Sequence, residues 1–523
     1  MQTRVLFNSI EFIFFFLPIT VILYFFTARK IGNEAAIKSL VFCSLFFYSW
    51  WNPSYLILLL FSMFFNYWLG KQLSKSRNKS VLTFGIFINL ALIAYYKYAG
   101  FLVNNFNVLT NSNYEIGSII LPLAISFFTF QQIAYLVDSY RGITKEYHFA
   151  HYALFVSFFP QLIAGPIVHH KQMLPQFNKP DAFIPNANNF AIGLSIFAIG
   201  LFKKTVIADG IAPYANTTFS AADAGQTLDF FQAWGGVLAY TFQLYFDFSG
   251  YSDMAIGLAR IFGIILPLNF YSPYKALSIS EFWRRWHITL STFLRDYIYI
   301  PLGGNRAGKF KRYNNLLITM LLGGLWHGAG WNFVIWGALH GSYLVINHGW
   351  QASCRINPFL SKLTTKWLSW LITFIAVIIG WVFFRAITTE GAFSLLSSMA
   401  GLNGFEVPNA IMQRLGELKL ILNQLGIQAG EAGGSQFVSN WLWVFVVGLI
   451  TMMMPNTYDL FSKNQPALVS KSAEFTNELW PFKSKTLRLY WRQNKAWGYL
   501  SGALLAFGLL TLGQVSEFLY FQF

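Results

Sequence analysis

The chain has 523 residues, of which 55% are hydrophobic and only 11% carry a charge, whereas a soluble domain carries about 25% charged residues. The surplus of apolar side chains, 56 phenylalanines among them, predicts an integral membrane protein. A formal net charge of +16 would also suit a nucleic-acid binder, but basic loops on the cytoplasmic side of a membrane explain it more simply.

The first hydrophobic stretch is expected to be a retained membrane helix and not a cleaved signal peptide. Arg4 is the single charge that precedes it, and no cleavage site of small residues follows. Apolar stretches of about 17–23 residues can cross a bilayer as helices. The predicted crossings lie near residues 8–27, 36–51, 54–70, 81–97, 117–137, 186–207, 228–248, 367–385, 439–455 and 497–516.

Two further apolar segments contain helix breakers. Residues 314–347 are long enough for two short helices, but Gly323, Gly324 and Gly328 interrupt them, which predicts a hairpin that enters the membrane and returns. Residues 158–166 predict a second re-entrant piece. Broken helices at membrane depth require protein or a water-filled cavity around them.

The distribution of Lys and Arg predicts the orientation. With the N-terminus outside, the cytoplasmic loops hold 30 of the 37 basic residues and the outer loops hold four. Positive charge accumulates on the cytoplasmic side, so both termini are expected outside and the basic loop at 275–313 inside. This orientation requires that residues 314–347 form a hairpin, because a single crossing there would place the last basic loop outside.

His327 is the first candidate for chemistry. It lies between Trp326 and Gly328, at the tip of the predicted hairpin. An ionisable group at membrane depth is costly and indicates function, and a histidine can accept a proton near neutral pH. The alternative is a histidine that only forms a hydrogen bond between helices.

His287 ends a segment in which Arg and aromatic residues alternate. Arg284, Arg285 and Trp286 precede it. Such a segment can lie flat in the membrane interface. Alternatively, the arginines form a basic mouth that attracts an anionic donor, such as the phosphates of coenzyme A, and His287 lies between that mouth and the membrane interior.

Asp247 and Asp253 are expected at the inner end of the crossing at 228–248. Carboxylates in a membrane can relay protons, but the end of a span is a mild environment, which favours a structural role for both. No metal site is expected, because His169 and His170 lie in a polar loop without the further ligands that zinc requires. Neither a serine-nucleophile elbow nor a phosphate-binding loop is found in the sequence.

Several motifs resemble the membrane-bound O-acyltransferase family, and most of all its bacterial alginate O-acetyltransferase branch. They are YFDFSGYSDMAIG at 245–257, EFWRRWH at 281–287, LRDY at 294–297, LGGNR at 302–306, GGLWHG at 323–328, PQLIAGP at 160–166 and FNS at 7–9. The resemblance covers essentially the whole chain. It implies one membrane-embedded domain, 1–523, with a catalytic core at 120–350, an outer loop at 386–438, and a last helix and tail at 497–523.

The resemblance also implies a mechanism. An all-α ring of about ten to twelve membrane helices would have a funnel on each side of a thin partition. An acetyl group would pass from a cytoplasmic thioester, acetyl-CoA, to a hydroxyl outside. His327 would act as the general base, and His287 would seat or polarise the donor.

The C-terminal sequence FLYFQF, at 518–523, resembles the aromatic tails of envelope acylation systems. The resemblance implies that Tyr520 accepts the acyl group and passes it to a periplasmic SGNH-type acetyltransferase. The alternative for Tyr520 is an aromatic anchor at the membrane interface.

The expected product is an O-acetylated extracytoplasmic polysaccharide, first of all an alginate-like exopolysaccharide made at the bacterial inner membrane. Peptidoglycan acetylation and D-alanyl transfer to teichoic acid are alternatives within the same chemistry. A transporter or flippase is an alternative from a different class.

Overall fold

The computed structural model describes residues 6–117, 119–144, 148–306, 308–430, 433–469, 489–513 and 519. These residues are predominantly helical, which confirms the predicted all-α class. Six helical stretches are long and apolar enough to cross a membrane, and each coincides with a predicted crossing. They are Phe12–Lys30, Pro53–Ser76, Lys79–Thr110, Ala187–Asp223, Lys366–Arg385 and Gly434–Met453.

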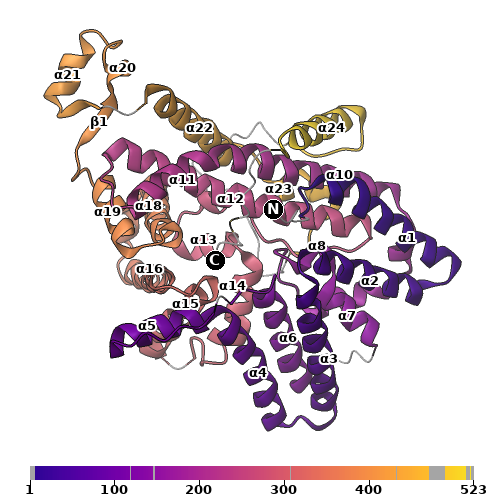
Figure 1. The fold of residues 1–523 in the computed structure, drawn as a ribbon. Helices are drawn as coiled ribbons and strands as arrows, with labels where there is room; N and C mark the ends of the chain where they lie inside the picture. Colours follow the sequence, from indigo (N-terminus) through magenta and orange to yellow (C-terminus); the bar gives the residue numbers. More distant parts are fainter. Residues whose placement is uncertain are drawn as a thin grey trace.

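The first third of the chain forms a group of helices in which α3, α4 and α6 run side by side in the lower part of Figure 1. The elements are η1 (Phe12–Phe16), α1 (Leu17–Lys30), α2 (Asn33–Trp51), α3 (Pro53–Ser76), α4 (Lys79–Ile93), η2 (Ala94–Tyr98), α5 (Ala99–Thr110), α6 (Ile125–Tyr140), α7 (Phe149–Ser157) and α8 (Phe159–Leu162). The segment expected to be re-entrant at 158–166 contains α8 and is buried along its whole length.

The predicted crossing at 117–137 is wrong in its first half, because α6 begins only at Ile125. Proline at 122 lacks a backbone donor for a helix, and Ala124 adopts a left-handed conformation with φ of 59°. The apolar run therefore continues across a turn that hydropathy alone does not detect.

A long helix, α12, passes through the middle of the molecule (Figure 1). It packs closely on α10 because glycines face each other: a Cβ added at Gly193 would lie 2.6 Å from the carbonyl oxygen of Gly257. The same distance separates a Cβ added at Gly200 from the carbonyl oxygen of Gly250. The elements here are α9 (His170–Phe177), η3 (Pro180–Phe183), α10 (Ala187–Phe202), η4 (Lys203–Ala208), α11 (Asp209–Asp223) and α12 (Phe230–Ile261).

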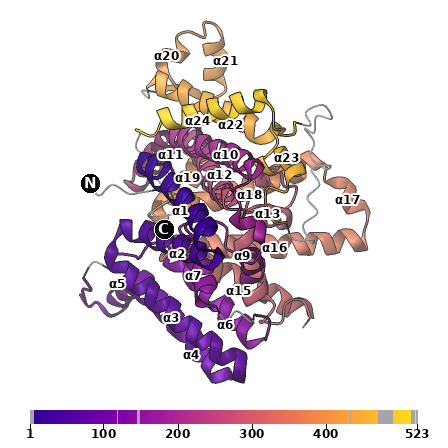
Figure 2. The same cartoon turned by 90° about the vertical axis from the view of Figure 1, so that its right-hand side faces the viewer.

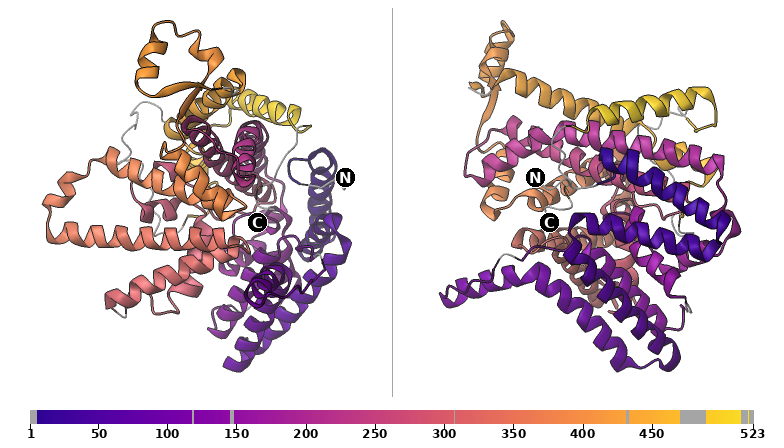
Figure 3. Two further views of the ribbon diagram at one scale, coloured as in Figure 1. Left: turned by 60° about the vertical axis from the view of Figure 1, so that its left-hand side comes forward. Right: turned by 45° about the vertical axis from the view of Figure 1, so that its right-hand side comes forward.

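The hairpin expected at 314–347 is present as two long neighbouring helices, α15 and α16 (Figure 3, left). The break predicted at Gly328 is confirmed, since α15 ends at His327 and α16 begins at Trp331, but the break predicted at Gly323 and Gly324 is wrong, because α15 runs through both. Gly324 serves close packing, because an added Cβ would overlap the carbonyl oxygen of Phe333. The elements are η5 (Pro273–Lys275), α13 (Ile279–Arg285), α14 (Ile288–Leu294), η6 (Arg295–Tyr299), α15 (Gly308–His327) and α16 (Trp331–Ile356).

A small lobe follows α19 and projects from one corner of the molecule (Figures 1 and 2). Its two strands pair in parallel, with Phe405 opposite Ile427. The described elements that follow α16 are α17 (Phe359–Leu363), α18 (Lys366–Arg385), α19 (Thr389–Met399), β1 (Phe405–Pro408), α20 (Asn409–Met412), α21 (Leu418–Gln424), β2 (Ile427–Gly430), α22 (Gly434–Met453), α23 (Thr457–Leu460), η7 (Ser462–Asn464) and α24 (Lys495–Leu510). The lobe occupies the outer loop predicted at 386–438.

Candidate active site

His327 is the last residue of α15 and lies among aromatic rings. The residue is only 6% exposed. The ring centroids of Trp326, Trp336 and Phe384 lie 4.9, 5.1 and 5.0 Å from the centroid of its imidazole. These rings keep bulk water from the imidazole, so a neutral histidine here can accept a proton from a bound hydroxyl.

The C-terminal end of α15 is held by two side chains of η2. Lys97 donates from Nζ to the carbonyl oxygens of Trp326 and His327, at 2.6 and 2.9 Å. The Tyr98 hydroxyl donates to the carbonyl oxygen of Leu325 at 2.5 Å. These bonds satisfy carbonyls that a helix end leaves without partners, and the ammonium lies at the negative end of the helix dipole. Lys97 lies at the end of the crossing predicted at 81–97, and nothing in the sequence indicated this contact.

His287 is fully buried and has a left-handed backbone, with φ of 41°. Its Nδ1 lies 3.1 Å from Oδ1 of Asn269, an oxygen that also accepts a hydrogen bond from the Thr289 hydroxyl at 2.8 Å. Because that oxygen is an acceptor, we assign the imidazole proton to Nδ1, which leaves Nε2 as an acceptor. Among the described residues Nε2 has no hydrogen-bond partner.

The two histidines approach each other through Trp326. Its ring centroid lies 4.9 Å from that of His327 and 6.2 Å from that of His287. The structure therefore brings together the two histidines that the sequence singled out, although they are 40 residues apart in the chain. Asn269, which orients His287, carried no signal in the sequence.

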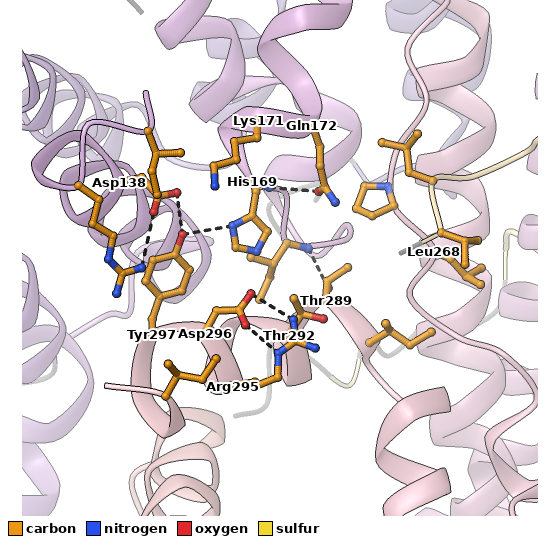
Figure 4. A pocket seen from close by; sticks show the side chains of 18 residues that line it. Asp138, His169, Lys171, Gln172, Leu268, Thr289, Thr292, Arg295, Asp296 and Tyr297 are labelled. Atoms are coloured by element: carbon orange, nitrogen blue, oxygen red, sulfur yellow. Dashed lines mark hydrogen bonds and ion pairs between the residues drawn. The ribbon is translucent and has the colours of Figure 1, made fainter. Parts of the chain in front are cut away.

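A cavity of about 480 Å³ lies beside the segment that follows His287: Ile288 and Thr289 form part of its wall, and His287 itself does not line it. Three basic side chains, Arg141, Lys171 and Arg295, and two carboxylates, Asp138 and Asp296, also line it. Arg295 pairs with Asp296 at 2.7 Å (Figure 4), and Arg141 lies 3.9 Å from Asp138. Almost all of its lining lies in loops that the charge distribution places on the cytoplasmic side.

A polar group of three side chains lies in the wall of this cavity (Figure 4). The Tyr297 hydroxyl donates to Oδ2 of Asp138 at 2.9 Å and lies 3.3 Å from Nδ1 of His169. Burial lowers the pKa of His169 below its usual range. A neutral His169 donates from Nδ1 to the tyrosine oxygen. The sequence analysis had considered His169 only as a metal ligand.

The predicted donor-binding set of Arg284, Arg285 and Trp286 is not assembled around the large cavity, and neither arginine lines it. The buried guanidinium of Arg285 pairs with Glu281 at 2.6 Å, and Arg284 is exposed. Trp286 is buried, with its ring centroid 4.9 Å from that of Trp381. Arg and Trp alternate here along and directly after a short helix, α13, and a role of Arg284, Arg285 and Trp286 in donor binding stays a prediction.

A second cavity, of about 20 Å³, adjoins His327 and is roughly large enough for one water molecule. Trp286 and Phe384 line it together with Asp247 and Leu519. Leu519 reaches this cavity from the far end of the chain. Tyr520, the predicted acyl acceptor, lies outside the described residues, so its role stays a prediction.

Asp247 and Asp253 lie within α12, which continues to Ile261. The expectation that they stand at the end of a span is therefore wrong. Both are in ion pairs: Asp247 with Lys204 at 2.6 Å, and Asp253 with Lys203 at 2.6 Å. These pairs favour the structural alternative, because a buried carboxylate requires a partner.

Comparison with known proteins identifies the family to which this sequence belongs. The model of the membrane-bound O-acyltransferase family (MBOAT) matches residues 137–389. A peptidoglycan O-acetyltransferase from Helicobacter pylori is 48% identical over 429 residues, which cover 76% of this chain and 80% of that protein. A probable alginate O-acetylase from Pseudomonas aeruginosa is 43% identical over 75% of this chain and 74% of its own length. A teichoic acid D-alanyltransferase from Streptococcus thermophilus is 30% identical over 51% of this chain and 69% of its own length. This chain is therefore a multi-pass membrane protein and an acyltransferase of the membrane-bound O-acyltransferase family.

Proposed function

We propose that this enzyme transfers the acetyl group of cytoplasmic acetyl-CoA across the membrane for O-acetylation of an extracytoplasmic polysaccharide. The observation that carries the proposal is the pair of cavities, one lined by Ile288 and Thr289 directly after His287 and the other lined by His327, with the Trp326 ring between the two imidazoles. A donor that enters beside His287 and an acceptor that enters beside His327 would meet between these two histidines.

The large cavity is the proposed entry for the donor. Its three cations, Arg141, Lys171 and Arg295, outnumber the two carboxylates of its lining, so the cavity keeps a net positive charge for the phosphates of coenzyme A. Arg284 and Arg285 remain further candidates for donor binding. The pantetheine arm would then run toward His287. With Nε2 as an acceptor, His287 can hold an amide N–H of that arm, so it seats the donor and does not polarise the thioester carbonyl.

His327 is the proposed general base. The acceptor hydroxyl oxygen bonds to the thioester carbonyl carbon while its proton passes to the imidazole of His327. The carbon–sulfur bond then breaks, and the leaving coenzyme A thiolate takes the proton from the imidazolium of His327, which restores the neutral base. The buried aromatic setting keeps water from hydrolysing the thioester.

On the outer side, Tyr520 is the proposed acceptor of the acetyl group, as a phenyl ester. A periplasmic SGNH-type acetyltransferase would take the group from the tyrosine to the polysaccharide. This requires the bacterial inner membrane and both termini on the periplasmic side, which the 30 basic residues of the cytoplasmic loops favour.

The comparisons favour acetyl transfer over D-alanyl transfer, because the acetylating relatives align over 75–76% of this chain and the teichoic acid enzyme over 51%. The first candidate for the polymer is an alginate-like exopolysaccharide. Peptidoglycan is a second candidate, since the peptidoglycan O-acetyltransferase from Helicobacter pylori is 48% identical.

Replacing His327 with Gln tests the proposal. Base-released acetate on the extracellular polymer should fall by at least about 100-fold, because the general base is lost. His340→Gln is the matched control: His340 is also fully buried, lies on the other helix of the same hairpin, and lines neither cavity. Undiminished acetylation in a correctly folded His327→Gln protein would refute the enzyme mechanism and favour a transporter.

A further inference from the structure

Three charged side chains form a buried cluster beside the small cavity. Nζ of Lys204 lies 2.7 Å from Oδ1 of Asp209 and 2.6 Å from Oδ1 of Asp247. All three side chains are at most 4% exposed. Burying charges is costly, so such a cluster needs a compensating benefit. The three groups together carry two negative charges and one positive charge.

The second carboxylate oxygen of Asp247 accepts a hydrogen bond from Leu519, near the C-terminus. The backbone N–H of Leu519 donates to Oδ2 of Asp247 at 3.4 Å, whereas Lys204 contacts Oδ1. Leu519 is only 1% exposed and lines the same small cavity as His327. The two oxygens of one carboxylate thus serve two different partners.

We propose that Asp247, held in place by Lys204, is the docking point for the C-terminal tail at the active site. The Asp247 carboxylate accepts the backbone N–H of Leu519, and the Leu519 side chain forms part of the cavity wall. Leu519 precedes Tyr520 directly, and consecutive Cα atoms are about 3.8 Å apart, so docking limits how far Tyr520 can lie from His327. Asp247 is therefore a positioning residue for the proposed relay, and this inference rests on the proposed function.

Asp209 provides a matched control within the same cluster. It pairs with the same lysine and is equally buried, but the N–H of Leu519 donates to Asp247 and not to Asp209. An Asn at 247 has one oxygen, which Lys204 would retain, so its NH₂ group would face the N–H of Leu519. An Asn at 209 leaves the Asp247 carboxylate and its contact with the tail intact. A purely structural role predicts similar effects for both substitutions.

The docking is tested by maleimide labelling of Leu519→Cys in the full-length, detergent-solubilised protein, with Cys43 and Cys354 replaced by Ala. We expect slow labelling in this parent protein and labelling about tenfold faster when Asp247→Asn is added, since a charge-assisted hydrogen bond is lost. Asp209→Asn should change the rate by less than about twofold. Equal rates in both variants, or labelling of the parent as fast as in denaturant, would overturn the proposal.

A second pair of variants avoids the buried charges altogether. Leu519→Pro removes the N–H donor, and Leu519→Ala, which also loses the branched end of the leucine side chain, keeps the donor. Acetyl transfer should be at least about tenfold lower for Leu519→Pro than for Leu519→Ala. Equal activities would overturn docking through the backbone. Labelling requires no acyl chemistry, so protected Leu519→Cys in a protein without acetyl transfer would refute the proposed function but not the docking.

Discussion

Lys97 lies 230 positions before His327 in the chain and binds the end of the helix that carries this histidine. Its ammonium and the Tyr98 hydroxyl satisfy the last three carbonyls of α15. A helix end without such partners would have to find water, which the surrounding rings exclude. The position of His327 thus depends on a side chain from a distant part of the chain.

Lys97→Met should fray the end of α15 and lower acetyl transfer by at least about tenfold, because hydrogen bonds to a charged group contribute about 1.5–3 kcal/mol. Lys97→Arg, which keeps the charge and several donors, should retain more activity. Base-released acetate and the melting temperature in detergent measure the two effects. If the Met variant matches wild type in both, the capping argument is wrong.

Asn269 orients His287 in a similar way. Asn269→Leu removes the oxygen that accepts from Nδ1 of the imidazole, so Nδ1 would no longer be fixed as the donor. We expect a KM for acetyl-CoA raised by about tenfold, since one hydrogen bond to the donor is lost. Thr289→Val, which leaves the Asn269–His287 bond in place, should raise the KM much less. An unchanged KM in the Leu variant would contradict the seating role.

The sequence identified His327 and His287 because ionisable groups among glycine and aromatic residues are unusual. It did not identify Lys97, Asn269 or Leu519, whose contacts join distant parts of the chain. Local composition contains no information about such contacts. Only packing brings these groups to the histidines.

At the scale of the elements, the hairpin of α15 and α16 shows how glycine can mislead. Gly323 and Gly324 resemble a helix break in the sequence, but the helix continues because Gly324 lies against the backbone of α16 at Phe333. The break follows at Gly328–Gly330, where α15 has ended at the histidine. Both the close contact and the break use the small size of glycine.

Gly324→Ala should destabilise the hairpin by about 1–3 kcal/mol, because a Cβ there meets a carbonyl oxygen that cannot move aside. Gly323→Ala is the matched control, since its Cβ would lie 3.2 Å from Cδ1 of Leu294, the end of a flexible side chain. The melting temperatures in detergent should separate the two variants. Similar melting temperatures would show that the close approach of the helices contributes little.

At helix α12 the prediction errs as well, because the helix continues where an end was predicted. Hydropathy placed the end of a crossing at residue 248, whereas the helix continues to Ile261 with Asp247 and Asp253 inside it. Polar residues can lie along a central helix because neighbouring helices supply partners such as Lys203 and Lys204. A hydropathy window detects contact with lipid and cannot detect burial in protein.

At the scale of the whole molecule, the charge distribution makes a prediction about orientation. Lys171 lines the large cavity, and Arg414 is exposed in the projecting lobe. With Cys43 and Cys354 replaced by Ala, Arg414→Cys should react with an impermeant maleimide in intact cells. Lys171→Cys should react only after permeabilisation. The reverse pattern would invert the proposed direction of transfer.

The sequence by itself determined that this chain is a helical membrane protein and an acyltransferase of its family, and it singled out His327 and His287 as candidates for the chemistry. Composition, hydropathy and local motifs are properties of neighbouring residues, so they can be read without a structure. Only the tertiary structure placed the basic cavity beside His287, the Lys97 cap on α15, and Leu519 on Asp247 beside His327. These arrangements join residues up to 272 positions apart, and packing alone decides which distant side chains meet.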